Sequence, residues 1–512
     1  MTADPHSNAP PLSAPIGPDA PATATRLRGR RLAAAALLAL AIALGGWLRL
    51  DAIGAREMSA DEGASWAAAA APSLAGVMRI QAALNPGKLA VYEIALHGWM
   101  KLFGGGLGAM RTLSAIFDTF NIVVVFMLVR ELLVKRPSAK QNQDAALGAM
   151  PYAEAQAVAA LAALLFAVNL VAIKYARELR MYPLALLVVL LQVWIFVRVV
   201  RRGPALFDLA LLAVLTALAV ATHFSAAFMF AAEALCLAAA PLIWPRGGRY
   251  PLATAFAIGG AFGAGAAIFL LVALPDLRSG AQAFANGATG WIERPRWWAP
   301  LSLFNKGAGS VAFPVMAALA VWGAWRGWAR AREATAFALA WMWLPPLLML
   351  AASYGFSPMF VERYALWCFV PFFMLAALGA WEVSGAPARA LAIGVAVCLA
   401  LSHLHAYARR PHDTQWREAA RAAAGALAPG EKIAVAPPYA VNAVRYYLHV
   451  TQAAGAAVPA DDAGVRGGTA GVLVIGDQWN AHAEVATLRK GYPRPIAAFR
   501  DVRVCGRGTP AR

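Results

Sequence analysis

Cysteine is scarce in this chain, with four residues among 512, and none falls in a spacing typical of a metal site. Cys236, Cys368 and Cys398 lie within apolar runs and Cys505 lies near the C-terminus, so the sequence does not support a disulfide framework. Charged residues are also few, at 14%, and the 27 acidic residues are outnumbered by 45 Lys and Arg. The basic residues fall in small groups between apolar runs and form no compact basic face, which argues against nucleic acid as a partner.

Apolar residues dominate what is present. The chain is 60% hydrophobic, and its mean hydropathy is +0.57. A soluble protein of this length could not bury so much apolar surface, so lipid must surround most of it. The sequence predicts an α-helical polytopic membrane protein with about eleven spans of ~20 residues each, at roughly 32–50, 111–131, 154–174, 182–200, 205–222, 224–243, 251–273, 304–325, 334–352, 364–382 and 388–407.

The N-terminal residues 1 to 31 are expected to form a disordered cytoplasmic tail, because residues 1 to about 25 are rich in Pro, Ala and Ser without apolar periodicity. Four arginines between 26 and 31 precede the first apolar run. A cleaved signal peptide is the competing interpretation, but the run ends in Leu48-Arg49-Leu50-Asp51, which is no small-residue cleavage site. Basic groups recur in alternate connections, which favours an uncleaved anchor with its N-terminus inside.

After residue 408 the composition changes to that of a soluble domain. Lys432–Ala436 and Gly471–Gly476 are predicted as buried strands, and Glu418–Leu427 as a helix that ends before Pro429-Gly430. We expect a small α/β domain over 409–512. With an odd number of spans it lies outside, opposite the N-terminus, and a transmembrane domain occupies 32–408.

The long connection at 51–110 contains two adjacent carboxylates, Asp61 and Glu62, about ten residues beyond the first span. Short amphipathic pieces of this connection, such as Val91–Leu102, suit helices that lie along the membrane surface. Two acids in this position can be a general base or hard oxygen ligands for a cation. A solvated loop with two functionless acids is the alternative.

An ordered series of short motifs resembles the bacterial dolichyl-phosphate-mannose-protein mannosyltransferase-like family. That family is a branch of the C-type glycosyltransferases, and the branch also contains the lipid A aminoarabinose transferases. The resemblance spans about 32 to 450. One departure is Asn85-Pro86-Gly87, where the family often has His-Pro-Pro. The motifs that carry the resemblance are Asp61-Glu62, Asn85-Pro86, Trp99–Gly104, Met110–Ala115, Val129–Leu132, Tyr175–Tyr182, Thr222–Phe224, Glu362–Tyr364 and Gln415–Ala420.

The resemblance implies a C-type glycosyltransferase fold and transfer of a hexose or pentose from a polyprenyl-phosphate carrier, such as undecaprenyl phosphate. The acceptor would be a protein, lipid A or another lipid, or a glycan on the outer face of the bacterial inner membrane. Such a reaction needs a base near the acceptor and positive charge or a metal at the leaving phosphate. Asp61, Glu62 and Glu178 are the catalytic candidates. Asp61 and Glu178 are also candidate ligands if a divalent cation (Mg, Mn or Zn) takes part.

Five basic residues on the same side are candidates for binding the donor phosphate. The fork of donors on Arg363 suits a phosphate better than Lys would, although an arginine at a membrane edge often only extends its charge into water. A lone histidine such as His223 is more often structural, and Glu178 between two arginines is also consistent with an interfacial ion-pair cluster. Trp291, Trp297 and Trp298 are expected as interfacial anchors. The phosphate-binding candidates are Arg363, Arg180, Lys88, Arg111 and His223.

A transporter or flippase of a polar or lipid-linked solute is the competing function. Transporters tend to place ionisable groups in mid-span and to show an internal repeat. Here the acids gather at one face and no repeat is evident. A non-catalytic assembly subunit gives no reason for acids to collect at outer junctions, so the sequence favours the enzyme.

Overall fold

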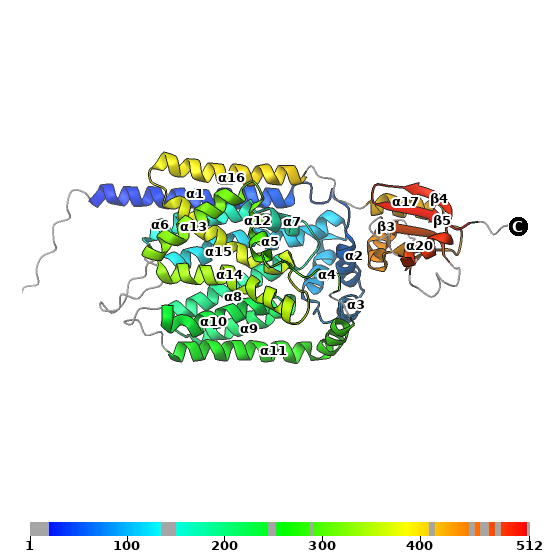
Figure 1. Cartoon of the computed structure of the whole chain (residues 1–512), viewed down its shortest axis with the longest axis horizontal. Helices are drawn as coiled ribbons and strands as arrows, with labels where there is room; N and C mark the ends of the chain where they lie inside the picture. Colours follow the sequence, from blue (N-terminus) through cyan, green and yellow to red (C-terminus); the bar gives the residue numbers. More distant parts are fainter. Residues whose placement is uncertain are drawn as a thin grey trace, which may run out of the picture.

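A computed structural model describes residues 20–134, 150–243, 252–286, 290–408, 415–449, 456–460, 470–476 and 483–508. A bundle of long helices forms most of the molecule, and a small sheet domain stands beyond one end of it (Figure 1). The first helix, α1 (Ala20–Leu50), begins earlier than the sequence predicts, because helix-forming residues continue back from the apolar run. Residues 20–31 of the tail predicted to be disordered are therefore helical, which corrects that prediction, and residues 1–19 lie outside the described residues.

Each of the eleven expected spans coincides with a helix or a bent pair of helices. Within the described residues, seven helices are long and apolar enough to cross a membrane, and counting each bent pair as one span gives up to nine. The two remaining expected spans match the shorter apolar helices α9 and α10. The bundle consists of α1, α5 (Leu107–Leu133), α6 (Tyr152–Ala167), α7 (Leu170–Ala176), α8 (Tyr182–Arg202), α9 (Leu206–Thr222), α10 (Ala226–Ile243), α11 (Leu252–Ala285), α12 (Ala299–Ala308), α13 (Phe313–Arg330), α14 (Arg332–Gly355), η1 (Glu362–Cys368), α15 (Phe369–Trp381) and α16 (Ala386–Ala408).

Two expected spans are bent rather than straight. α6 and α7 meet at 60°, and α12 and α13 meet at 110°. Asn169 begins α7 by accepting a hydrogen bond from Ala172 N at 2.7 Å, and its amide donates to Gly307 O, also at 2.7 Å. Gly309, with φ +86°, ends α12 in a conformation that favours glycine. The Asn169 side chain therefore connects the two bends, which sequence periodicity could not reveal.

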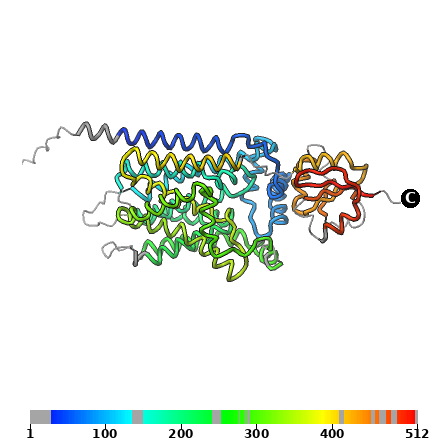
Figure 2. The backbone as a smooth tube through the Cα atoms, turned by 45° about the horizontal axis from the view of Figure 1, so that its top comes forward, coloured from blue at the N-terminus to red at the C-terminus, as the bar shows by residue number. Residues whose placement is uncertain are grey.

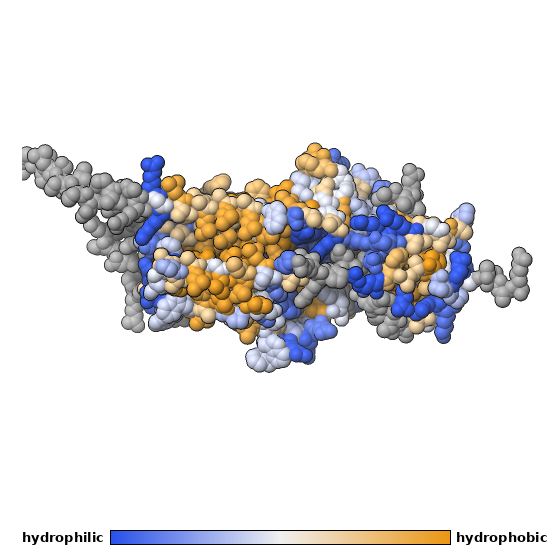
Figure 3. All heavy atoms as spheres, turned by 90° about the horizontal axis from the view of Figure 1, so that it is seen from above, coloured by the Kyte–Doolittle hydropathy of each residue, from blue (hydrophilic) through white to orange (hydrophobic). Residues whose placement is uncertain are grey.

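The surface of the bundle matches a lipid environment. Hydrophobic residues cover the middle of the visible face, and hydrophilic residues gather toward the sheet domain and at the start of α1 (Figure 3). Large apolar side chains such as Phe256 (77% exposed) and Val321 (71% exposed) face outward from the helices. A soluble protein rarely exposes such a continuous apolar surface. The chain is therefore a multi-pass membrane protein.

Basic residues from distant connections meet at the end of the bundle where α1 begins. Glu154, at the start of α6, lies 3.8 Å from Arg30 of α1 and 3.3 Å from Arg330 at the end of α13. The sheet domain lies at the opposite end (Figures 1 and 2). This arrangement agrees with an odd number of crossings between the N-terminus and the C-terminal domain.

Three short helices form a layer between the bundle and the sheet domain (Figure 1). The layer consists of α2 (Ala60–Ala69), α3 (Leu74–Leu84) and α4 (Val91–Phe103). The amphipathic piece expected at Val91–Leu102 corresponds to α4. The C-terminal part of α11 continues past Pro275 and reaches this layer, where a Cβ on Gly87 would lie 2.9 Å from Gly280 Cα.

The C-terminal domain has a mixed five-stranded sheet in the order β2-β1-β3-β5-β4. β1 pairs in parallel with β2 and β3, whereas β5 pairs antiparallel with β3 and β4. The strand predicted at Lys432–Ala436 is β1, and the one at Gly471–Gly476 lies in β3, which is buried throughout. The elements are α17 (Trp416–Gly425), β1 (Lys432–Ala436), η2 (Pro438–Ala440), α18 (Val441–His449), β2 (Ala457–Pro459), β3 (Ala470–Gly476), α20 (Ala483–Lys490), β4 (Arg494–Ala498) and β5 (Val502–Gly506).

Candidate active site

The first turn of α2 places the two adjacent carboxylates in different surroundings. Ser59 caps the helix by accepting from Glu62 N, and Glu62 accepts from Ser59 N in return. This reciprocal capping follows from the Ser-x-x-Glu spacing. Successive helical residues point about 100° apart, so Glu62 is buried (1% exposed), whereas the Asp61 side chain is 60% exposed.

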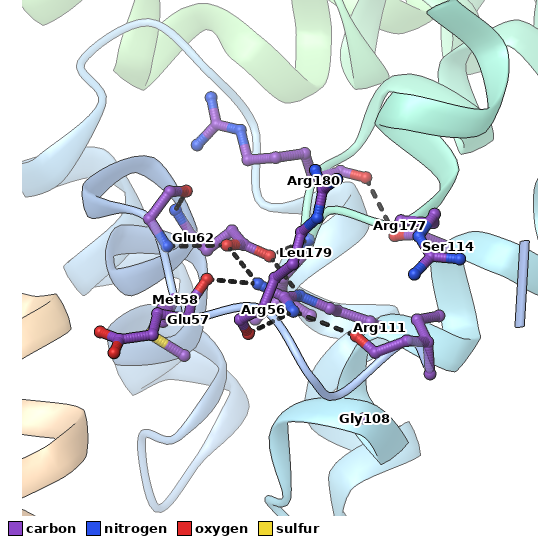
Figure 4. A network of polar contacts seen from close by, with 12 residues as sticks. Arg56, Glu57, Met58, Glu62, Gly108, Arg111, Ser114, Arg177, Leu179 and Arg180 are labelled. Atoms are coloured by element: carbon purple, nitrogen blue, oxygen red, sulfur yellow. Dashed lines mark hydrogen bonds and ion pairs between the residues drawn. The ribbon is translucent and has the colours of Figure 1, made fainter. Parts of the chain in front are cut away.

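Both oxygens of Glu62 are fully occupied by structural partners (Figure 4). Oε1 accepts from Arg111 Nε and from Leu179 N, each at 2.8 Å. Oε2 accepts from Arg111 Nη2 at 2.9 Å and from Ser59 N at 2.8 Å. A carboxylate with four donors has no lone pair left for an acceptor proton or a metal. This geometry favours a structural role over the catalytic role that the sequence predicted for Glu62.

Arg111 is equally occupied. Besides its bidentate contact with Glu62, its guanidinium donates to three backbone carbonyls of the segment that leads into α2, those of Ile53, Arg56 and Glu57, at 3.1, 2.9 and 2.8 Å. These contacts use all five N–H donors of the side chain. Arg111 therefore joins α5 to α2 and has no donor free for the lipid phosphate that the sequence assigned to it.

We expect a break in this pair to destabilise the protein. Arg111→Met would leave the Glu62 carboxylate buried without its charge partner, a change that typically costs about 3–5 kcal/mol. Glu62→Gln keeps the shape of the side chain, but it places an amide N–H donor against an N–H donor of the Arg111 guanidinium, so one hydrogen bond is lost. Both variants should unfold at lower temperature in detergent than wild type, whereas Glu293→Gln, an exposed acid in 290–298, should not. A wild-type unfolding temperature for Glu62→Gln, together with loss of turnover, would instead assign Glu62 a catalytic role.

Asp61 is accessible and forms an ion pair with Arg180. Arg180 Nη2 lies 3.8 Å from Asp61 Oδ2, and Arg180 Nη1 donates to the Asp61 carbonyl at 2.9 Å. The Arg180 side chain is only 7% exposed, and its buried Nε has no hydrogen-bond partner among the described residues. A buried guanidinium with an unused donor beside an exposed carboxylate can bind a further anion.

Lys88 is a second cation at this site. It follows the turn after α3, where its backbone N–H donates to Asn85 O at 3.1 Å, whereas its ammonium group makes no hydrogen bond or ion pair with the described residues. Burial, followed by the charge of Arg180, lowers the pKa of Lys88 to about 8, although Asp61 and Glu93 act in the opposite direction. The lysine is therefore mostly charged at neutral pH, and it is close enough to Arg180 and Arg363 to respond to their charges.

Arg363 of η1 is the third cation and is surrounded by aromatic rings. Its guanidinium carbon lies 5.2 Å from the ring centroid of Trp291, 5.7 Å from Tyr364 and 5.8 Å from Tyr182. Its Nε is buried and unpaired in the described structure. Ring stacking orients a guanidinium without using its N–H donors. Trp291, expected as an interfacial anchor, thus contributes to the site.

His223 ends α9 inside the same aromatic cluster. Its ring centroid lies 4.6 Å from that of Tyr364 and 5.7 Å from that of Tyr182, and Nδ1 contacts Ser225 Oγ at 2.6 Å. Burial, assisted by Lys88 and the two arginines, holds its pKa well below the usual range. The imidazole is therefore neutral and can offer a phosphate a hydrogen bond but no charge, which is weaker than the role predicted from sequence.

Glu178 lies on the turn between α7 and α8. Burial raises the pKa of this carboxyl to about 7. The negative charges of Glu62 and Asp61 raise it further, whereas the positive charges of Lys174 and Arg180 lower it. Its side chain makes no hydrogen bond with the described residues. A carboxyl that titrates near neutrality can exchange a proton with a reacting group.

Glu93, at the start of α4, was not predicted as a site residue. It is 4% exposed and accepts from the Ser65 hydroxyl at 3.2 Å. Burial raises its pKa, and Arg180 and Lys88 oppose the shift. In the sequence, an acid in the first turn of an amphipathic helix is indistinguishable from a solvated surface residue, so no local signal marked Glu93.

The fold defines the class of this protein: it is a polytopic membrane protein with the C-type glycosyltransferase fold. The crystal structure of ArnT from Cupriavidus metallidurans bound to undecaprenyl phosphate is similar, with a TM-score of 0.56 and 12% identity over 92% of this chain and 97% of that one. The apo ArnT structure gives 0.57 at 11% identity. The archaeal oligosaccharyltransferase AglB from Archaeoglobus fulgidus, in complex with an inhibitory peptide and a dolichol-phosphate, gives 0.55 at 11% identity, over 90% of this chain and 72% of that one. No family model and no curated protein matches the sequence.

The two acids predicted as metal ligands, Asp61 and Glu178, can be compared with the ligand sets that divalent cations require. One structure of the archaeal oligosaccharyltransferase contains Zn and sulfate, with a TM-score of 0.51. In the described part of this chain, no three His, Cys, Asp or Glu side chains are grouped to hold a metal ion. Asp61 and Glu178 alone do not make up such a ligand set, and Arg180 already lies beside Asp61. The described residues therefore do not form a complete ligand set for the predicted cation.

Proposed function

We propose that this protein transfers a sugar from a polyprenyl-phosphate donor to an acceptor at the outer face of the bacterial inner membrane. The observation that carries the proposal is the group of Lys88, Arg180 and Arg363 beside the accessible carboxylate of Asp61, at the end of the bundle toward the C-terminal domain. Three cations with donors to spare suit the phosphodiester of such a donor and the more highly charged phosphate monoester that leaves. Neighbours of the same fold that bind undecaprenyl phosphate or dolichol-phosphate support a lipid-linked donor.

The reaction follows from these roles. Asp61 accepts the proton of an acceptor hydroxyl while the oxygen of that hydroxyl attacks the anomeric carbon of the sugar. The bond between that carbon and the phosphate oxygen breaks, and the lipid phosphate leaves with one additional negative charge. Arg180, Arg363 and Lys88 stabilise this charge as it develops. With an acceptor that is already ionised, such as a phosphate, Asp61 would act by positioning alone.

The alternative of a transporter or flippase receives less support. The buried acids in the middle of the bundle are paired across helices: Glu233 of α10 accepts from Gln192 Nε2 at 2.9 Å, and Asp118 of α5 forms an ion pair with Arg49 of α1 at 2.7 Å. Polar side chains that pair across helices are a usual means of helix association in a membrane. Lys88 and Arg363, which form no ion pair with the residues that the structure describes, lie instead at one end of the bundle, where a reaction on a lipid headgroup would take place.

A donor panel tests the proposal. Purified protein in liposomes would receive radiolabelled polyprenyl-phosphate hexoses and pentoses, with membrane protein, lipid A and glycan fractions as acceptors. We expect label to pass to one fraction and free polyprenyl phosphate to appear in equal amount. Redistribution of intact donor between leaflets without release of lipid phosphate would favour the flippase.

The charge of Lys88 predicts a pH dependence for donor capture. Since Lys88 is charged below its pKa of about 8 and neutral above it, kcat/KM for the donor should fall as pH rises through about 8. The fall should approach tenfold per pH unit if only the charged form binds, because kcat/KM reports ionisations of the free enzyme. Lys88→Arg stays charged throughout this range and should shift this fall above pH 10. An unchanged alkaline fall in Lys88→Arg would assign the titration to another group.

A further inference from the structure

The C-terminal domain contacts the segment that carries Asp61. The Tyr447 hydroxyl of α18 accepts a hydrogen bond from Met58 N at 2.6 Å, and Glu57 Oε2 accepts from Arg417 N of α17 at 2.8 Å. Met58 is 1% exposed in this contact. The carbonyl of Glu57 also accepts from Arg111, so the same two residues connect the C-terminal domain to the Glu62–Arg111 pair.

Helix α2 itself packs directly on α18. A Cβ on Gly63 would lie 2.5 Å from Ala443 N and 2.9 Å from Asn442 C, so the two backbones approach closer than any side chain allows. One turn later, the rings of Trp66 and Tyr446 meet edge to face at 5.4 Å. Gly63 is two residues from Asp61, and a shift of α18 would therefore move the carboxylate.

An acid pair completes the junction. The carboxyls of Glu57 and Glu418 interact, and Glu418 Oε2 is buried without another partner in the described residues. Two carboxyls in contact share a proton, since both cannot be charged at close range. Burial, followed by Glu418, raises the pKa of Glu57 to about 7. Arg417 holds one side of the pair, and its guanidinium lies 5.4 Å from the Tyr447 ring.

We propose that the C-terminal domain is a positioning part of the active site, which sets the orientation of Asp61 through the Tyr447–Met58 hydrogen bond and the Gly63–Ala443 contact. Tyr447 and Gly63 are positioning residues, because they act through α2 and touch no reacting group. The effect on catalysis rests on the proposed function. The contact between the C-terminal domain and the segment before α2 does not, and it can be measured without any sugar donor.

Hydrogen exchange measured by mass spectrometry tests the junction in the full-length protein. Tyr447→Phe keeps the ring against Arg417 but offers Met58 N–H no acceptor, so exchange of peptides covering 55–62 should rise about threefold to tenfold, as expected for one lost hydrogen bond. Tyr492→Phe is the matched control. That residue is another buried tyrosine of the domain, and its hydroxyl donates to Ala470 O at 3.1 Å, away from α2. It should leave exchange of 55–62 unchanged.

Turnover tests the positioning role. In Tyr447→Phe we expect kcat to fall about tenfold with the donor KM within about twofold of wild type, since small misplacements of a reacting group lower the chemical step more than binding. Gly63→Ala should lower kcat further, about a hundredfold. Wild-type hydrogen exchange in Tyr447→Phe would show that the Tyr447 hydroxyl does not hold the segment before α2. Increased exchange with an unchanged kcat would show that the contact contributes to packing only and does not position Asp61. If wild-type protein acts on no donor, the proposed function fails, while exchange still decides whether Tyr447 holds the segment.

Discussion

Asp61→Asn is expected to lower turnover by about two to four powers of ten, the range found when a general base is removed. The asparagine has the same shape but cannot accept a proton, and it weakens the attraction to Arg180, which lies 3.8 Å away. Because the Asp61 side chain is exposed and makes no contribution to the Glu62–Arg111 pair, the variant should fold normally. Transfer would be measured at matched expression with the donor identified by the panel.

Comparison with three further variants identifies the base. Glu178→Gln tests the half-buried carboxyl between α7 and α8, Glu62→Gln tests the buried one, and Glu293→Gln controls for loss of an exposed acid in 290–298. Each would be assayed with and without added divalent cation. A hydroxyl acceptor should show the full Asp61 effect, whereas an ionised phosphate acceptor should show a smaller one. Near wild-type transfer in both Asp61→Asn and Glu178→Gln would contradict the proposed site.

Arg363→Ala is expected to lower kcat/KM for the donor on the order of a hundredfold or more, the loss expected when a charged contact with the phosphate is removed. Arg363→Lys should restore only part of this activity. Lysine keeps the charge but loses the planar fork and the stacking against Trp291, Tyr182 and Tyr364, at 5.2, 5.8 and 5.7 Å.

Arg296→Ala is the matched control, because Arg296 is exposed and its guanidinium also stacks on a tryptophan, Trp298, at 5.1 Å. It should keep wild-type activity. Equal losses in the two alanine variants would mean that the tryptophan contacts, and not the phosphate, explain the effect. Full activity in Arg363→Ala would leave this arginine as a membrane-edge anchor.

The sequence was most informative where structure depends on local composition. In the described residues, nine of the eleven expected spans coincide with helices or bent helix pairs long and apolar enough to cross a membrane, because a bilayer selects apolar runs of sufficient length whatever their neighbours are, and the other two coincide with shorter apolar helices. β1 matches the predicted strand, since a short apolar run bounded by turn residues is itself the signal. The 60° and 110° bends escaped prediction because Asn169 and Gly307 meet only in the folded chain.

The candidate site also has features that follow from local sequence and features that depend on the fold. The sequence by itself determined that this is a membrane protein with acids and cations gathered at one end, because hydropathy and charge placement are properties of short segments. Only the tertiary structure decided which charges are already neutralised. Glu62 and Asp61 are neighbours in the chain, but Arg111, 49 residues away, occupies Glu62, and Arg180, 119 residues from Asp61, leaves that carboxylate accessible. A buried ion pair forms wherever packing brings two side chains together, and no local pattern records which partner that will be.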